Sequence, residues 1–335
     1  MPKNSGSPSS ESSETHEVVI IGGGPAGLST ALYTTRLNHD TALVDRGGGR
    51  SAMMVDTHNV IGVPEETSGN EFLQTARDQL QYYGTEFYRD IATDVSKSQA
   101  SGYEFEIALN EETLYTDRVV LATGFADKKP DPPLPRTGHG LHYCLHCDGY
   151  MFQDEPVYVM GHSNSAAYVA MIMLNFTDSV DLLLRGDEPT WDEHTEKLLH
   201  AHPVNIIDEE ITGMFKDKED PAWLGGFEFA DGTIREYTGG FALYGSKYNN
   251  GLAEGLGCEL NDDGTVVVDE HNETTVDGVY AVGDLIPGHN QIPIAMGQGA
   301  KAGIAIHKDL RTYPKSLEEL SHKTADSTTP AASDD

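Results

Sequence analysis

Short apolar runs, each followed by a turn and an amphipathic stretch, organise the first part of the chain. The run at 17–21 is rich in valine and isoleucine, and a β-branched run of this length predicts a buried parallel strand. A glycine-rich turn at 22–27 follows, then a helical stretch at 28–36 and a short strand at 41–44. This order predicts a βαβ unit close to the start of the folded chain.

Further along, the hydrophobic pattern marks a boundary between two domains. Residues 71–83 place apolar side chains on one face at helical spacing, and Gly84 provides a helix stop. From 91 to 120 the pattern alternates and turns as a meander of short strands does. Four prolines within 128–135 exclude a helix and a central strand, so we interpret this segment as the crossing into a second domain.

The opening pattern recurs after this crossing, which suggests a duplicated nucleotide-binding unit. Its strand, turn, helix and strand are predicted at 156–160, 161–166, 167–174 and 180–184. A return crossing near 239–250 leads to a last strand and helix, which we expect to rejoin the first domain. The predicted fold class is α/β, with two three-layer Rossmann-like dinucleotide-binding domains, the second inserted into the first.

Acidic residues outnumber basic ones along the whole chain. The 335 residues include 54 acidic and 22 basic ones, a formal net charge of −32. A scattered surplus of this kind is typical of proteins from very salty cytoplasms, where salt screens self-repulsion. Nucleic-acid binding is disfavoured, because phosphates would be repelled.

Several absences in the sequence predict a cytoplasmic protein without membrane contact. No apolar run reaches the roughly 18 residues that span a bilayer, and the serine-rich start lacks the apolar segment of a signal peptide. Three cysteines, two of them in one Cys-x-x-Cys, do not make a secreted disulfide framework. The ends of the chain, 1–15 and 316–335, are predicted to be disordered tails.

A dinucleotide fingerprint follows the first predicted strand. Gly22 permits the tight turn, Gly24 lets the backbone approach a pyrophosphate, and Gly27 lets helix and strand pack closely. The following helix offers amide donors at its N-terminus. Asp45, at the end of the second strand, would accept hydrogen bonds from a ribose.

Two later strand ends favour FAD over NAD as the bound dinucleotide. Thr123 and Gly124 close the strand that ends at residue 121, and Gly283 and Asp284 close a strand late in the chain. Asp284 could hold the ribityl or pyrophosphate region of the flavin. Alone, each is a strand end with a turn, but together with the fingerprint they outline one site from three distant segments.

The candidate reactive group is the pair Cys144 and Cys147. Two intervening residues let the sulfurs approach bonding distance in a tight turn, and such pairs commonly contain one thiol with a lowered pKa. Asp148 could donate or accept a proton during thiol chemistry. A zinc site using His142 and His146 with the two cysteines is the alternative, but no second ligand pair of suitable spacing exists, so we predict no metal.

The order of these motifs resembles that of low-molecular-weight thioredoxin reductases, here of a haloarchaeal type, over about 17–310. The resemblance implies a homodimer, an FAD domain at 16–125 and 246–315, and an inserted pyridine-nucleotide domain at 126–245 that carries the cysteines. It implies that Cys144 attacks the substrate disulfide, that Cys147 lies against the flavin, and that Asp148 is the acid. It also implies further FAD contacts from Arg46, Arg50, Asn59, Gln291 and Ile292.

The second nucleotide turn departs from the family pattern. Thioredoxin reductases carry Gly-x-Gly-x-x-Ala there, whereas this chain has Gly161-His-Ser163-Asn164-Ser165-Ala. Ser163 puts a Cβ where the backbone should approach the pyrophosphate. Of the family's basic cluster for a 2′-phosphate, only Arg185 remains. The motif is therefore degenerate for NADPH or NADH.

The leading interpretation is an FAD-dependent dithiol/disulfide oxidoreductase that acts on a thioredoxin-like protein or a small dithiol. Such erosion resembles two sets of relatives: thioredoxin-reductase-like flavoproteins fed by other donors, and dithiol oxidases that pass electrons from a substrate dithiol to oxygen. The dithiol oxidase is the runner-up. A non-enzymatic FAD- or zinc-binding module would leave the Cys-x-x-Cys unexplained.

Overall fold

We describe the protein from a computed structural model, in which residues 13–100, 102–131, 134 and 137–317 are described. Most of the two predicted tails lies outside these residues. Residues 13–15, which the tail prediction included, instead form the start of the first strand, because they pair with residues 113–115. That part of the prediction is wrong.

The first domain is built on a seven-stranded mixed sheet in the order β3-β2-β1-β6-β5-β4, with β17 also paired to β6. Its parallel strands are β1 (Ser13–Ile21), β2 (Thr41–Val44), β3 (Glu86–Tyr88), β6 (Thr113–Leu121) and β17 (Val279–Ala281). The antiparallel strands β4 (Asp94–Lys97) and β5 (Phe105–Ala108) complete the predicted meander.

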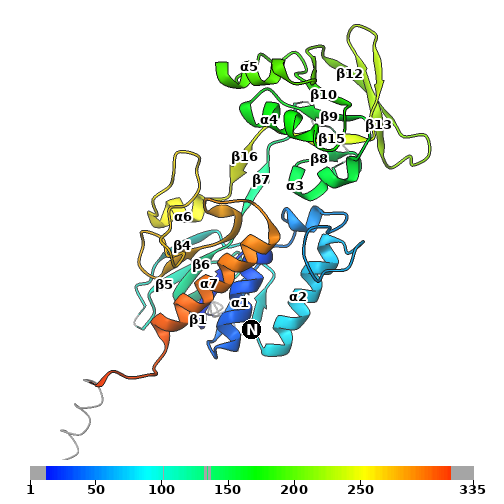
Figure 1. The fold of residues 1–335 in the computed structure, drawn as a ribbon. Helices are drawn as coiled ribbons and strands as arrows, with labels where there is room; N and C mark the ends of the chain where they lie inside the picture. The colour runs from blue at the N-terminus through cyan, green and yellow to red at the C-terminus, as the bar shows by residue number, and fades with distance from the viewer. Residues whose placement is uncertain (1–12, 101, 132–133, 135–136, 318–335) are drawn as a thin grey trace, which may run out of the picture.

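Three helices cover one face of this sheet (Figure 1), namely α1 (Pro25–Arg36), α2 (Gly69–Tyr83) and α7 (Ile292–Leu310). Helices α1 and α7 pack closely because α7 presents glycines to α1: a Cβ on Gly299 would lie 2.2 Å from the carbonyl oxygen of Ala26. A second apolar cluster fills the other face, where the strands pack against α6 (Gly251–Leu256) and against Cys258 and Val266. The sheet thus lies between two packed layers.

The second domain contains a five-stranded parallel sheet in the order β11-β10-β9-β15-β8. Its strands are β8 (Leu141–His142), β9 (Val157–Met160), β10 (Val180–Leu183), β11 (Asn205–Ile207) and β15 (Gly239–Ala242). One face packs against α4 (Asn164–Met173) and α5 (Glu193–Ala201). The other packs against an antiparallel sheet of β12 (Ile211–Lys216), β13 (Leu224–Phe229) and β14 (Ile234–Glu236). This antiparallel sheet and α5 were not predicted from the sequence.

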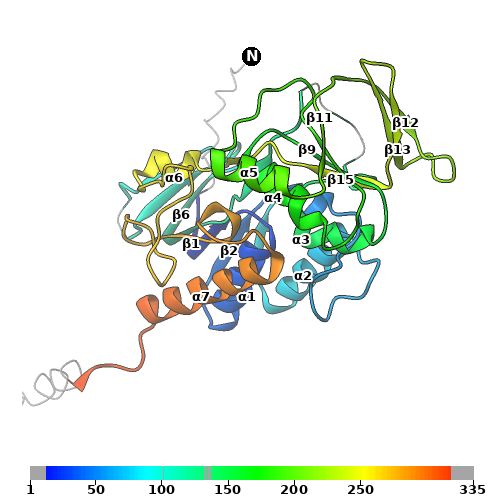
Figure 2. The ribbon, with the colours of Figure 1, turned by 45° about the horizontal axis from the view of Figure 1, so that its top comes forward.

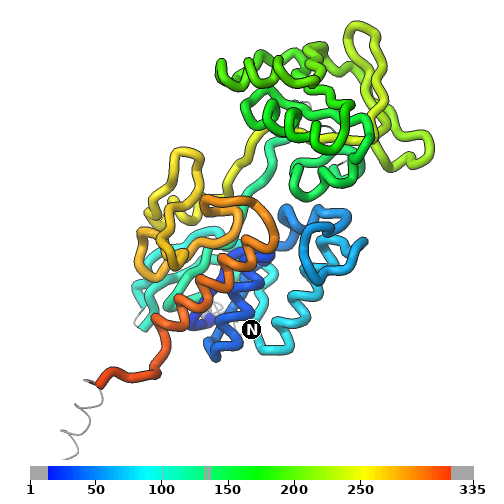
Figure 3. The backbone as a smooth tube through the Cα atoms, viewed as in Figure 1, coloured from blue at the N-terminus to red at the C-terminus, as the bar shows by residue number. Residues whose placement is uncertain are grey.

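Two antiparallel strands, β7 (Phe125–Asp127) and β16 (Ser246–Tyr248), join the two lobes seen in Figures 1 and 3. Single-turn helices complete the chain: η1 (Ser51–Met53), α3 (Leu145–Asp148), η2 (Gly149–Phe152) and η3 (Gly283–Leu285). From the direction of Figure 2, α3 lies close to the loops of the first domain. Among the described residues, no helix is both long and apolar enough to cross a bilayer.

The helix boundaries follow from local sequence. α1 begins at Pro25, three residues before its predicted start, because proline suits the first helical position after the cap Gly24. α2 starts with a capping box in which Ser68 and Glu71 bond each other's backbone N–H groups, and it ends at Gly84 in the left-handed conformation (φ 95°). The predicted stop at Gly84 is confirmed.

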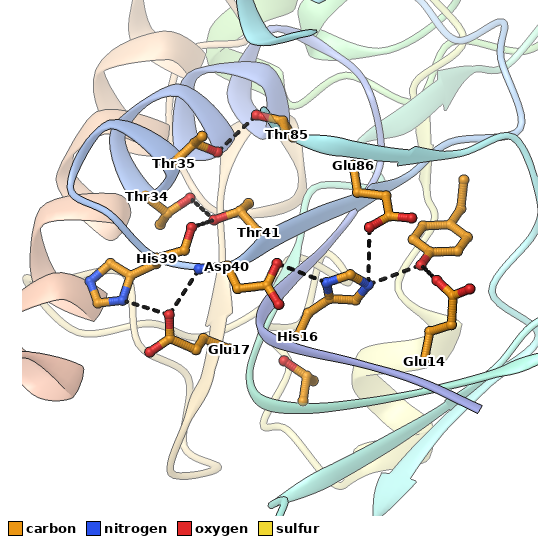
Figure 4. Close-up of polar contacts among 12 residues, drawn as sticks. Glu14, His16, Glu17, Thr34, Thr35, His39, Asp40, Thr41, Thr85 and Glu86 are labelled. Atoms are coloured by element: carbon orange, nitrogen blue, oxygen red, sulfur yellow. Dashed lines mark hydrogen bonds and ion pairs between the residues drawn. The ribbon is translucent and has the colours of Figure 1, made fainter. Parts of the chain in front are cut away.

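A polar network links the first half of β1 to Asp40, just before β2, and to side chains of β3 (Figure 4). The buried ring of His16 lies 3.1 Å from Asp40 through Nδ1 and 2.9 Å from the Tyr88 hydroxyl through Nε2. Tyr88 donates in turn to Glu14, and Glu86 lies 4.0 Å from Nε2. The network stands at the opposite end of β1 from the glycine-rich turn, so it ties the sheet together away from the dinucleotide fingerprint.

Candidate active site

A cavity of about 640 Å³ opens at the carboxyl ends of β1, β6 and β17. Parallel strands of an open sheet place ligand sites at this edge. Twelve of the thirteen predicted FAD contacts line it: Gly22, Gly24, Asp45, Arg46, Arg50, Asn59, Thr123, Gly124, Gly283, Asp284, Gln291 and Ile292. Three distant segments therefore converge on one cavity, which is large enough for a dinucleotide.

The fingerprint turn has the geometry that a dinucleotide requires. Gly22 adopts φ 116°, and a Cβ there would lie 2.3 Å from the carbonyl oxygen of Ala122. A Cβ on Gly27 would lie 2.0 Å from the Gly22 carbonyl oxygen, so Gly27 packs helix on strand and is not a lining residue. Nothing lies within 4 Å of a Cβ built on Gly24, which leaves room at the N-terminus of α1 for a phosphate.

Asp45 is held at the cavity wall by an arginine that sequence reasoning missed. Nη2 of Arg77 lies 3.0 Å from Oδ2 of Asp45. Arg77 belongs to α2, and nothing in its sequence context marks it as part of the site. The ion pair fixes one carboxylate oxygen of Asp45 and leaves the carboxylate at the cavity, where it can accept from a ribose.

Thr123 and Gly124 line the cavity and also anchor the return crossing. The Thr123 hydroxyl donates to the carbonyl oxygen of Asn249 at 2.7 Å, and the Asn249 side chain donates back to the Thr123 carbonyl at 2.8 Å. The Ala-Thr-Gly segment therefore positions the second crossing as well as the cavity wall, a role that the sequence did not reveal.

Asp284 is half-buried next to a charged pair. Burial raises the pKa of its carboxyl, the Arg50 guanidinium lowers it, and Asp127 raises it again. Arg50 itself donates from Nε to Asp127 at 2.9 Å. The Gln298 side chain accepts from the Gly283 N–H at 2.9 Å, which fixes the turn that carries Asp284.

Cys144 and Cys147 form a disulfide on α3, with Cα atoms 5.3 Å apart. Cys147 lines the large cavity and also a second cavity of about 120 Å³, whereas Cys144 is among the lining residues of the smaller one. Met53, Val55, Met151 and Trp223 form apolar walls of this smaller cavity. The disulfide thus lies where the two cavities meet.

The disulfide is tied to both domains. Gln291 Nε2 lies 3.5 Å from Cys144 Sγ, and Asn59 bridges the Gln291 side chain (2.8 Å) and the carbonyl oxygen of His146 (3.2 Å). In the second domain, Oδ2 of Asp148 lies 3.0 Å from Nδ1 of His142. Of the residues named for the zinc alternative, the two cysteines are joined to each other and His142 lies beside Asp148.

The second nucleotide turn is covered by acidic residues. His162 Nδ1 lies 3.4 Å from Asp187, and Asp192 and Asn164 exchange two hydrogen bonds of 2.9 Å at the start of α4. Ser163 caps this helix in extended conformation, and Ser165 is exposed in its first turn. Arg185 (φ 61°) donates to the carbonyl oxygen of Asp131 at 3.2 Å. The loop after β10 therefore brings Asp187 and Asp192 beside the second glycine-containing turn.

Comparison with known proteins places this geometry in context. A family model described as pyridine nucleotide-disulphide oxidoreductase matches residues 16–299. Thioredoxin reductase of Aquifex aeolicus (strain VF5) is 30% identical over 315 residues, 89% of this chain and 94% of the relative. The F component of alkyl hydroperoxide reductase in Staphylococcus aureus (strain Mu50 / ATCC 700699) is 30% identical over 305 residues, 88% of this chain but 59% of the relative.

The fold is also similar to that of solved structures. The crystal structure of thioredoxin reductase from Streptococcus pyogenes MGAS5005 superposes with a TM-score of 0.79 at 25% identity, covering 90% of this chain and 100% of that chain. The predicted α/β class with two Rossmann-type domains is confirmed. Because the family match runs from the first strand into the last helix, the chain belongs to the pyridine nucleotide-disulphide oxidoreductases, an enzyme family that uses a flavin and NAD(P)H.

Proposed function

We propose that the protein is an FAD-dependent dithiol/disulfide oxidoreductase that passes electrons between a donor, FAD, the Cys144–Cys147 pair and a protein disulfide such as that of thioredoxin. The observation that carries the proposal is the position of the disulfide between the two cavities. A carrier in the large cavity would meet Cys147, and a substrate sulfur in the smaller one would meet Cys144.

FAD suits the residues of the large cavity. The amides after Gly22 and Gly24 and the N-terminus of α1 would bind its pyrophosphate, and Asp45 and Asp284 would accept from ribose and ribityl hydroxyls. When bound, FAD supplies two-electron chemistry, which matches the two electrons of a disulfide. The chain's own residues would bind and orient the FAD, and Asp148 would accept or donate a proton beside the thiols.

The test of this proposal is direct. Purified protein should contain about one FAD for each chain and no stoichiometric zinc, and in the absence of oxygen its disulfide should accept electrons from the flavin. NADPH, NADH and a dithiol, supplied in turn without oxygen, identify the donor. A colourless protein that binds zinc through its cysteines would contradict the proposal. The homodimer that the family resemblance implies is tested by light scattering of the same sample.

Asp284→Asn is expected to stabilise the flavin-free protein at pH 7 and to weaken FAD binding. A raised pKa in the fold means that ionised Asp284 destabilises it, so the wild-type protein loses stability as pH rises above the usual aspartate range near 4. The melting temperature of the variant should exceed that of wild type by a few degrees at pH 7 and match it near pH 4. Equal melting curves at both pH values would refute this role of burial.

Salt is expected to stabilise the protein. The net charge of −32 implies strong self-repulsion in the compact state, and the Debye length shrinks from about 10 Å at 0.1 M to about 3 Å at 1 M salt. Melting temperature and activity should therefore rise from dilute buffer to molar KCl. A melting temperature that is flat or falling over this range would count against a halophilic protein.

An oxygen-dependent dithiol oxidase is the second candidate. Two observations favour it: the acidic residues Asp187 and Asp192 at the second nucleotide turn, and the small apolar cavity beside Cys144, which suits a small organic dithiol. Such an enzyme would consume oxygen when given a dithiol and would ignore both nicotinamides. An oxygen electrode with and without dithiol separates the two candidates.

A further inference from the structure

His142 and Asp148 form a pair beside the disulfide. Nδ1 of His142 lies 3.0 Å from Oδ2 of Asp148, and both residues line the smaller cavity with the two cysteines. We propose, on the basis of the proposed function, that His142 is the positioning residue for Asp148. It holds the carboxylate on the substrate side of the disulfide, where Asp148 takes the proton of the attacking thiol and returns it to the departing one.

The surroundings of His142 leave it one polar partner. It lies on β8, and its ring packs against Phe152, Phe241 and Trp223 at centroid distances of 5.4, 6.1 and 6.0 Å. Its Nε2 atom is buried and has no hydrogen-bond partner in the described part of the chain. Because the aromatic rings offer Nε2 no acceptor, we place the ring proton on Nδ1, which faces the Asp148 carboxylate at 3.0 Å.

Asp148 is held next to the cysteine pair by its backbone. It ends the short helix α3, and its backbone N–H donates to the carbonyl oxygen of Cys144 at 3.2 Å. Nδ1 of His142 lies 3.0 Å from Oδ2, so a proton on Nδ1 would face this carboxylate oxygen. With its side chain 21% exposed, Asp148 remains accessible from the smaller cavity, which is the arrangement of a general base.

Other ionisable groups around this cavity have different partners. Arg50 is paired with Asp127 at 2.9 Å, and His58 lies 3.1 Å from Glu65. The remaining ionisable lining residues are Asp56 and Tyr143, and burial raises the pKa of the Tyr143 hydroxyl. Among the described residues, His142 is the one histidine, lysine or arginine whose side chain lies within 4 Å of the Asp148 carboxylate.

The proposed step is a thiol–disulfide exchange in which Asp148 carries one proton from the attacking sulfur to the departing one. The reduced Cys144 thiol gives its proton to Asp148, and the thiolate attacks one sulfur of the substrate disulfide. The substrate S–S bond breaks, a Cys144–substrate disulfide forms, and the departing sulfur keeps the electron pair and takes the proton from Asp148. Cys147 then attacks Cys144, which releases the second substrate sulfur with the Cys147 proton and restores the Cys144–Cys147 disulfide.

A Cys147→Ser background isolates the first half of this step without electron flow from the flavin. In this background Cys144 reacts with 4,4′-dithiodipyridine, and the released thiopyridone reports the rate at each pH. His142→Leu should lower the rate at neutral pH roughly tenfold to a hundredfold and move the rising limb of the pH profile to higher pH. His142→Asn, whose amide N–H can replace Nδ1–H, should restore most of the rate and the profile.

Matched variants make the result decisive. His142→Gln places its amide nearer to the Nε2 position and should behave like the leucine variant, which also covers a leucine variant that fails to fold. Asp148→Asn should lower the rate of Cys144 by the same factor as His142→Leu. Adding His142→Leu to the Asp148→Asn variant should lower the rate no further. His139→Asn is the control, because His139 also lies near Trp223, at 6.0 Å, but is not bonded to Asp148.

Two outcomes would overturn the proposal. His142→Leu and His142→Gln could both leave the rate and its pH profile unchanged, or the losses from His142→Leu and Asp148→Asn could multiply. A Cys147→Ser protein that forms no mixed disulfide at all would instead contradict the proposed function. The two failures are therefore distinguishable.

Discussion

Cys144→Ser is expected to end disulfide turnover and leave a long-wavelength absorbance band, whereas Cys147→Ser should end turnover and abolish the band. The reason is the position of the two sulfurs: Cys147 lines the large cavity proposed for FAD, and Cys144 lines the smaller cavity. A lone Cys147 thiolate beside an oxidised flavin can give such a band, but Cys144 lies on the other side. Visible spectra of both purified variants, titrated with alkali, provide the measurement.

The control for this experiment is Cys258→Ser. Cys258 is buried, and its thiol is 3.4 Å from the Thr274 hydroxyl, in the core beneath the first sheet. This variant should keep both turnover and the wild-type spectrum. If Cys144→Ser lost the band while Cys147→Ser kept it, the two roles would be reversed.

NADPH is expected to reduce the flavin weakly, with a half-saturating concentration roughly tenfold to a hundredfold above that of a reductase with an intact site. Ser163 replaces the glycine that would meet the pyrophosphate. Arg185, the remaining cation after β10, already donates to the Asp131 carbonyl, and Asp187 would repel a 2′-phosphate. Stopped-flow bleaching of the flavin without oxygen measures this directly.

Removing the unfavourable features should improve NADPH reduction. The double variant Ser163→Gly with Asp187→Asn removes a Cβ and a negative charge. Adding a positive charge for the 2′-phosphate by Gly186→Arg is a poorer choice, because Gly186 has φ 79° and an arginine there would be strained. Asp178→Asn, an exposed residue before β10, is the matched control for charge. Fast bleaching of the unmodified protein by micromolar NADPH would refute the prediction and indicate an ordinary NADPH-dependent reductase. Bleaching by a dithiol alone would favour the oxidase.

The dinucleotide cavity was predictable from sequence because its parts are local. A strand, a glycine turn and a helix form within about 20 residues, and the φ of Gly22 and the packing of Gly27 follow from that turn. Strand ends of parallel strands must meet at one edge, which brings Asp45 and Asp284 together once the strands are recognised. The tail prediction failed at residues 13–15 because their pairing with β6 is long-range and leaves no local signal.

The sequence by itself determined the α/β class, the fingerprint turn, the Cys-x-x-Cys pairing and most lining residues, since periodicity and turn chemistry act over a few residues. The tertiary structure decided which cysteine meets which cavity, that Arg77 pairs with Asp45, and that His142 lies beside Asp148. These choices depend on side chains brought together by packing between separate elements. Hydrophobic burial fixes those elements relative to one another without leaving a local pattern to read.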